Sequence, residues 1–292
     1  MNVAESYAYC EKVARTRARN FYYSFVLLAP PQRRAMCAIY AFMRYCDDLS
    51  DDLPIDDRAG AIARWRSDLE QALAGRLPEN PLWPAFHDAV QRYRIPHEYF
   101  FEMIAGVNSD LETRQIAAFG ELYRYCYQVA SVVGLTIIHI FGFESPRALE
   151  LAEKCGIAFQ LTNILRDVRE DARNRRVYIP EEDLRRFGVD PAELSDSADP
   201  SGFIPLMAYE AARARRYYDE SWPLIDLVHR RSRPSLAALI EIYRTLLDRI
   251  EASGYDVLRG RIRVSTGRKV WIVLYNALTP AALLPHRAQQ HP

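Results

Sequence analysis

Two acidic clusters lie far apart in this chain, and each repeats aspartate at helical spacing. The first is the run YCDDLSDD, which contains Asp47, Asp48, Asp51 and Asp52. Residues four apart lie on the same side of an α-helix, so Asp47 and Asp51 are expected to point in one direction. Aspartate at the C-terminal end of a helix opposes the helix dipole. Two explanations stay open: a solvated helix end neutralised by Arg44, or a metal site at the rim of the core.

The second cluster, in the run NILRDVRED, continues a polar stripe. Gln160, Asn163, Asp167 and Asp171 recur three or four residues apart, and the segment that carries the first two, CGIAFQLTNIL, is apolar and small. Polar groups on a buried face need partners, which a metal ion and a substrate would supply. The alternative is a surface helix on which neighbouring arginines pair with the acids.

The two clusters together indicate a more specific chemistry than either one does alone. Mg²⁺ is commonly bound by a few carboxylates and by substrate phosphates. Arg44 and Arg166 each lie beside one cluster and could hold phosphate oxygens. No nucleophile or general base is suggested by the spacing, so the pattern favours metal-assisted departure of diphosphate. Such a reaction generates a carbocation, which suits an allylic substrate in an apolar cavity lined by aromatic rings.

Composition excludes several other classes of protein. The chain has 292 residues, 49% of them apolar, and its 38 basic residues balance its 38 acidic ones, so nothing indicates nucleic-acid binding. The five cysteines form no CxxC pair and predict buried free thiols in a reducing cytosol. No secretory signal or membrane-spanning run is present, and residues 129–143 are too short to span a bilayer. A cytoplasmic location is therefore expected.

The elements that must position these residues are predicted to be helices. Helical periodicity covers residues 33–46, 57–74, 97–107, 120–141, 146–172, 203–230, 234–251 and 267–278. Pro30-Pro31 marks a helix start, and Pro78, Pro81 and Pro84 mark a loop. Strand signals and glycine-rich phosphate loops are nearly absent. The prediction is one all-α domain over residues 1–292 around a central cavity, with residues 1–18 and 279–292 as peripheral ends.

With these features, the sequence resembles the squalene/phytoene synthase family of head-to-head prenyl diphosphate synthases. The matching stretches are NFYYSFVLLAPPQRRAMCAIYAFMRYCDDLSDD, YRYCYQVASVVG and AFQLTNILRDVREDARNRRVYIP, with a weaker match at GRIRVSTGRK. The resemblance runs from about Phe21 to Lys269. It implies the isoprenoid-synthase helical bundle and the 1′-1 condensation of two prenyl diphosphates through a cyclopropylcarbinyl diphosphate.

The resemblance also implies roles for individual residues. Metal binding falls to Asp47, Asp51, Asn163, Asp167 and Asp171. Contact with the reacting diphosphate falls to Tyr40, Arg44 and Arg166, while Tyr125 lies beside the reacting carbons. The substrate-binding positions are Phe21 and Gln160 in the cavity and Tyr178, Arg261 and Lys269 at the outer diphosphate.

The substrate, product and cofactors are expectations of the same kind. Mg²⁺ is the expected cofactor, with Mn²⁺ as a substitute, and NADPH joins it if the product is squalene. The substrates are two farnesyl or two geranylgeranyl diphosphates, and the aromatic residues of FYYSF favour the shorter one by narrowing the cavity. The product would be presqualene diphosphate or squalene, or else prephytoene diphosphate or phytoene, for hopanoid, sterol or carotenoid synthesis.

Two alternatives stay open beside this interpretation. One is a terpene cyclase on the same fold, which would use a single substrate molecule. The other is a non-catalytic lipid-binding paralogue, against which the intact acidic stripes argue. A greasy product favours peripheral contact with the inner face of a membrane, although no basic amphipathic segment stands out as an anchor.

Overall fold

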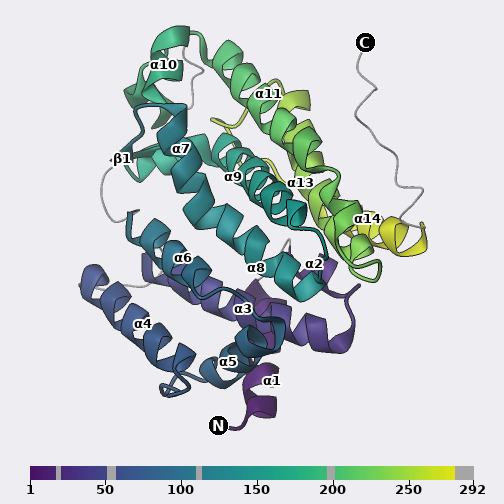
Figure 1. Cartoon of the computed structure of the whole chain (residues 1–292). Coiled ribbons are helices and arrows are strands. Elements are labelled where there is room, and N and C mark those ends of the chain that lie inside the picture. Colours follow the sequence, from purple (N-terminus) through teal and green to yellow (C-terminus); the bar gives the residue numbers. More distant parts are fainter. Residues whose placement is uncertain (18–20, 51–56, 110–113, 196–200, 280–292) are drawn as a thin grey trace.

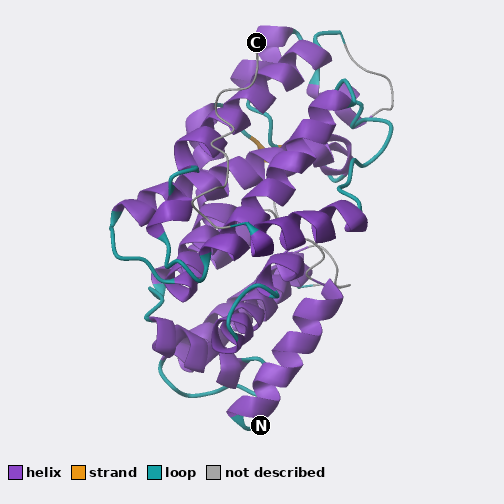
Figure 2. Cartoon of the chain, turned by 90° about the vertical axis from the view of Figure 1, so that its right-hand side faces the viewer, coloured by secondary structure: helices purple, strands orange, loops and turns teal. Residues whose placement is uncertain are grey.

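The computed structural model describes residues 1–17, 21–50, 57–109, 114–195 and 201–279. Figures 1 and 2 show that these residues are mainly helical. The helices of the first half are α1 (Val3–Arg17), α2 (Phe21–Phe25), α3 (Pro30–Ser50), α4 (Arg58–Leu73), α5 (Trp83–Tyr93), α6 (Glu98–Ser109), α7 (Phe119–Cys126) and α8 (Val132–Phe141), with the π-helical segment η1 (Tyr127–Ser131) joining the last two. The all-α fold class is confirmed.

The second half of the chain adds the remaining elements. They are α9 (Arg147–Arg173), α10 (Glu181–Phe187), the 3₁₀ segment η2 (Pro191–Ser195), α11 (Phe203–Ser221), α12 (Leu224–Leu227), α13 (Arg233–Ala252) and α14 (Thr266–Leu278). Two short strands, β1 (Arg114–Gln115) and β2 (Arg176–Val177), pair in parallel, with Arg114 opposite Arg176.

Helix α9 is the central element, and twelve of its 27 residues are buried. It packs against α8 and η1 on one side and against α11 and α13 on the other (Figure 1). Its polar stripe therefore starts inside the bundle and leaves it only near its C-terminal end. The acidic residues of this stripe thus lie where α9 emerges from the bundle.

Helix α3 is held by an aromatic cluster that fixes the position of its acidic end. The Phe42 ring stacks on Trp65 of α4 and on Phe86 of α5, with ring centroids 5.6 and 4.8 Å away, and meets Phe100 of α6 edge-on at 5.4 Å. Close aromatic packing of this kind contributes beyond the apolar area it buries. The predicted helix over residues 33–46 is confirmed, and its start at Pro30 is confirmed as well.

Several segments differ from their predictions for local physical reasons. Residues around Pro84 were expected to form a loop, but α5 begins there because proline is tolerated in the first turn of a helix. The helix expected over residues 120–141 contains η1, and the one over 203–230 is divided into α11 and α12 near Pro223, which lacks an N–H group. Helix α1, which lies within the expected peripheral end, packs on α3 and α5.

The cysteines follow the prediction. All five are buried free thiols. Burial raises the pKa of Cys10 and of Cys37 to about 12. Residues 129–143 lie mainly in η1 and α8, most of which is buried. Across the part of the chain that the structure describes, no helix combines the length and apolar composition needed to cross a bilayer.

A buried charged cluster joins α10 to α11. The Arg213 Nη1 atom donates to Asp183 Oδ2 at 2.9 Å and to both carboxylate oxygens of Glu210 at 2.7 and 2.8 Å. The Arg213 guanidinium also lies 4.2 Å from the ring centre of Phe119 at the start of α7. Burial raises the pKa of Glu210 to about 8; Arg213 opposes the shift, and the neighbouring Asp183 carboxylate adds to it.

This cluster predicts a specific dependence of stability on pH. A carboxyl whose pKa is raised on folding holds its proton in the folded state, so its stabilising contribution is complete below its ordinary pKa and is lost as the pH rises toward about 8. We expect the free energy of unfolding to fall over that range by up to about 1.4 kcal/mol per pH unit. The variant Glu210→Gln should flatten this slope in urea unfolding at a series of pH values. An unchanged slope would remove Glu210 as its cause.

Candidate active site

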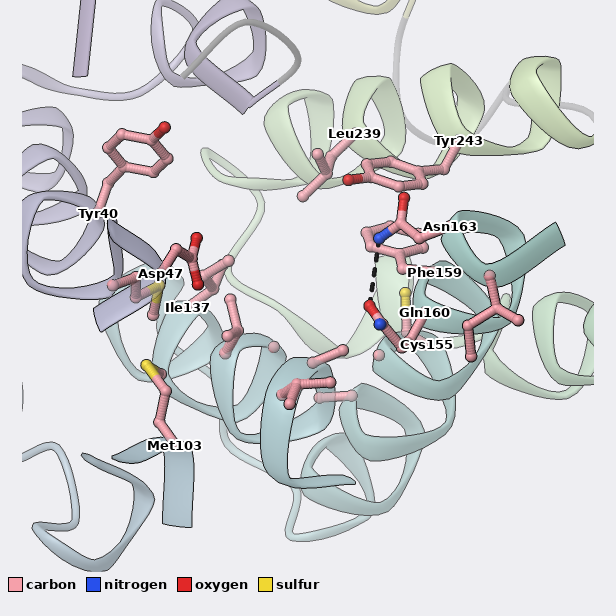
Figure 3. Close-up of a pocket in the computed structure, with 18 of the residues that line it drawn as sticks. Tyr40, Asp47, Met103, Ile137, Cys155, Phe159, Gln160, Asn163, Leu239 and Tyr243 are labelled. Carbon is pink, nitrogen blue, oxygen red and sulfur yellow. Dashed lines mark hydrogen bonds between the residues drawn. The ribbon is translucent and has the colours of Figure 1, made fainter. Parts of the chain in front are cut away.

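A cavity of about 460 Å³ lies at the centre of the bundle. Its walls come from α3, α6, η1, α8, α9 and α13, and most of them are apolar. Polar side chains gather along its α3 and α9 sides (Figure 3). The cavity can therefore enclose a hydrocarbon chain while a charged head group remains at its polar side.

The two acidic clusters meet in this cavity. Asp47 from α3 lines it together with Asn163, Asp167 and Asp171 from α9. Figure 3 shows Asp47 and Asn163 on opposite walls, with the Asp47 carboxylate directed into the space between them. More than a hundred residues of sequence separate Asp47 from Asn163, so only the fold brings these side chains together. Asp51, the other predicted member of the first cluster, lies outside the described residues.

Arginines already neutralise part of this acidic wall. Arg166 donates from Nε to Asp167 Oδ1 at 2.8 Å, and a second bond joins its Nη2 atom to Asp167 Oδ2. Arg261 also contacts both oxygens of Asp167, at 3.0 and 3.1 Å, and its Nη1 atom lies 3.1 Å from Glu170 Oε2. Burial by itself would lower the pKa of Arg166, but Asp167 outweighs burial and raises it. Arg166 and Arg261 are thus fixed cations at the cavity.

Arg44 is placed differently from the other predicted phosphate ligands. Its guanidinium pairs with Asp48, one turn along α3, and Arg17 of α1 contacts the same carboxylate at 2.9 Å. The cation expected beside the first acidic cluster is therefore present. Arg44 is not among the residues that line the central cavity in the described part of the chain.

Aromatic side chains line the cavity from several helices. Tyr125 of α7 and Tyr178, directly after β2, stack with ring centroids 4.7 Å apart and planes 17° from parallel. The Tyr40 ring stands beside Asp47 (Figure 3). Burial raises the pKa of Tyr40 to about 12, and Asp47 adds to this shift while Arg44 opposes it. The Tyr40 phenol therefore stays neutral at physiological pH, so it offers a ring face and a hydroxyl group but no negative charge.

Tyr243 of α13 is a cavity residue that the sequence reasoning missed. Its ring stacks on Phe159 of α9, with centroids 4.2 Å apart, and lies next to Asn163 (Figure 3). The Asn163 Nδ2 atom donates to Gln160 Oε1 at 3.2 Å. The only sequence signal for Tyr243 is its place on the inward stripe of α13 with Leu236 and Leu239, which does not distinguish it from an ordinary core residue.

A second cavity, of about 800 Å³, adjoins the first and has three lining residues in common with it. The shared residues are Arg166, Tyr243 and Arg261. Lys269, at the start of α14, lines this second cavity and not the central one. The structure describes no side chain for Phe21, so its predicted place in the cavity stays a prediction.

The donor atoms fit a hard divalent cation. Carboxylates from α3 and α9 face the cavity, and Asn163 Oδ1 is buried without a hydrogen-bond donor among the described residues. In the same part of the chain, no three His, Cys, Asp or Glu side chains stand close enough to hold a metal ion by themselves. A Mg²⁺ ion held here would complete its coordination with substrate phosphates and water, as is usual for this ion.

Comparison with known proteins identifies the family. The family model described as "Squalene/phytoene synthase" matches residues 4–268. The chain belongs to the squalene/phytoene synthase family. Among its relatives, the 15-cis-phytoene synthase of Synechococcus elongatus is 34% identical over 92% of this chain and 91% of that protein. Phytoene synthase 2 of Solanum lycopersicum is 37% identical over 92% and 88%.

The fold agrees with this membership. The crystal structure of a dehydrosqualene synthase in complex with ligand is similar to this one, with a TM-score of 0.87 and 31% sequence identity, covering 94% of this chain and 96% of that one. As a squalene/phytoene synthase family member, the chain is a prenyltransferase that acts on prenyl diphosphates. The predicted family, fold and enzyme class are confirmed, whereas the roles of the individual site residues stay predictions.

Proposed function

We propose that this enzyme condenses two geranylgeranyl diphosphates 1′-1 in a Mg²⁺-dependent reaction, giving phytoene through prephytoene diphosphate. The observation that carries the proposal is the cavity itself, whose lining joins Asp47 of α3 to Asn163, Asp167 and Asp171 of α9 beside a largely apolar interior. Substrate length is inferred from the relatives, because proteins 34% and 37% identical over nine-tenths of this chain are phytoene synthases. Carotenoid synthesis is the corresponding pathway.

Different residues of the cavity are proposed to bind the metal ion, the diphosphate and the carbocation. Asp47, Asn163, Asp167 and Asp171 would hold Mg²⁺, which neutralises the diphosphate and helps it to leave. Arg166 and Arg261 are placed to bind phosphate oxygens, and their fixed charges stabilise the negative charge that develops on the leaving group. The stacked rings of Tyr125 and Tyr178 face the cavity, where their π-electrons would stabilise a carbocation. The apolar walls exclude water that would otherwise capture it.

Condensation of two farnesyl diphosphates is the second candidate. Phe25 of α2, the last residue of FYYSF, lines the cavity and is 2% exposed, so it limits the space for a longer chain. The similar dehydrosqualene synthase structure also supports a shorter substrate. This candidate would give presqualene diphosphate and then dehydrosqualene, or squalene with NADPH as the reductant.

Product analysis tests both candidates. Purified enzyme would be incubated with farnesyl or geranylgeranyl diphosphate, with Mg²⁺ or EDTA and with or without NADPH, and the products identified by mass spectrometry. We expect a C40 hydrocarbon from geranylgeranyl diphosphate, formed only with the metal ion. A C30 product alone would establish the second candidate. A cyclic product from one substrate molecule would indicate a terpene cyclase, and no diphosphate release would indicate a non-catalytic protein.

A further inference from the structure

Helix α14 has two apolar faces, of which only one is packed. On the inner face Ile272, Val273 and Asn276 are buried against α13, and the Asn276 amide donates to Glu241 Oε2 at 3.0 Å. The outer face presents four large side chains at spacings of three and four residues: Trp271, Leu274, Tyr275 and Leu278, which are 48%, 56%, 36% and 83% exposed. The helix stands at the edge of the molecule (Figure 1). Its outer face is therefore an exposed apolar surface.

The stretch of sequence that contains this helix carries charges of one sign only. From Val257 to Pro292 the sequence contains six basic residues and no aspartate or glutamate, although the whole chain is neutral. Arg263 and Arg268 are exposed, and the Arg268 guanidinium lies 4.4 Å from the ring centre of Trp271. A tryptophan and a tyrosine flanked by arginine form the composition found where proteins meet the interface of a bilayer.

The same helix reaches the active site. Thr266 and Lys269, in its first turn, line the second cavity, which shares Arg166, Tyr243 and Arg261 with the central one. A surface that sits on lipid through the outer face of α14 would therefore lie next to a hollow that adjoins the catalytic cavity. That position suits substrates and products that partition into lipid.

We propose that the outer face of α14, formed by Trp271, Leu274, Tyr275 and Leu278, docks this enzyme onto an anionic lipid bilayer. Charge favours a bilayer over a second copy of the chain as the partner of this face. Two copies of a positive surface would repel each other, whereas anionic lipids attract clustered arginine and lysine. The apolar side chains would enter the interface, and the exposed Arg263 and Arg268 would contact the head groups. The fold supplies here the amphipathic anchor that was not evident from the sequence.

Vesicle binding by the full chain tests the proposal without prenyl substrate, so its result does not depend on which reaction the enzyme catalyses. We expect at least about tenfold tighter binding to phosphatidylcholine vesicles that contain phosphatidylglycerol than to phosphatidylcholine alone, and weaker binding at high salt. Leu274→Ser should weaken binding about tenfold. The matched control is Ile204→Ser, a substitution at a 50% exposed isoleucine at the start of α11, which should change binding less than about twofold.

A second readout locates the contact. Brominated lipid chains should quench the fluorescence of wild-type protein and quench Trp271→Phe much less, because Trp65 and Trp83 are buried and Trp222 is partly buried. Equal binding to both kinds of vesicle, or unchanged binding by Leu274→Ser, would overturn the proposal. A dimer that Leu274→Ser converts to monomers, together with no vesicle binding, would overturn it in favour of a second copy of the chain.

Discussion

Replacing Asp167 with asparagine is expected to lower kcat/KM by at least about 100-fold. Loss of a residue that only supports a metal ligand costs about 10- to 100-fold, and Asp167 is assigned as a ligand itself. The change also removes the carboxylate that holds both Arg166 and Arg261. Steady-state kinetics with varied Mg²⁺ should show a raised metal requirement as well as a lowered rate.

Glu170→Gln is the matched control for this variant. Glu170 lies on the same helix and also pairs with Arg261, but it is 58% exposed and is not one of the described residues that line the central cavity. An exposed ion pair contributes little, so the change in kcat/KM should stay below about fivefold. Full Mg²⁺-dependent activity in Asp167→Asn would show that the metal assignment is wrong.

Gly156→Ala is expected to lower the free energy of unfolding by about 3 kcal/mol, because the new methyl group overpacks a tight helix contact. A Cβ atom at Gly156 of α9 would lie 2.4 Å from Ser131 Cα and 2.8 Å from the carbonyl oxygen of Ala130, and both of these are backbone atoms of η1. Backbone cannot move aside as a flexible side chain can, so α9 and η1 would have to separate. Urea or thermal unfolding measures the loss.

Gly120→Ala is the matched control for Gly156→Ala. Glycine is a poor helix former, so alanine normally stabilises a helix by up to about 1 kcal/mol. Gly120 of α7 has no atom within 4 Å of an added Cβ, so Gly120→Ala should be neutral or stabilising. If Gly156→Ala were also stabilising, the close approach of α9 and η1 would not be a constraint on this fold.

Much of the site could be predicted because its chemistry is concentrated on two helices. Helix periodicity alone placed Asn163, Asp167 and Asp171 on one side of α9, and the apolar run before Asp47 located it at the end of a buried helix. Neither pattern predicts the distance between the two helices, because that distance is set by how α3 and α9 pack in the bundle. The side chain that Arg44 contacts was not evident either, since Asp47 and Asp48 lie three and four residues after it and both spacings bring side chains together on a helix.

Other features could not be predicted because tertiary packing determines which side chains are exposed and which line the cavity. In α14, Trp271, Ile272, Val273 and Leu274 form a continuous apolar run, so the sequence does not show which of them are exposed. Tyr243 resembles any inward residue of α13 until Phe159 and Asn163 are placed beside it. Helix α5 was missed because Pro84 breaks a helix in most positions and so indicates a loop, although proline is tolerated in the first turn.

The π-helical turn η1 determines which side chains of one cavity wall point inward. Tyr125, Val129, Val133 and Ile137 all face the cavity at intervals of four residues. In a regular α-helix each such step would turn by about 40° away from the last, because 3.6 residues complete a turn. The wider turn of η1 takes up an extra residue and offsets this drift. The identity of these side chains sets how wide the cavity is, whereas the number of residues between Tyr125 and Ile137 sets which of them border it at all.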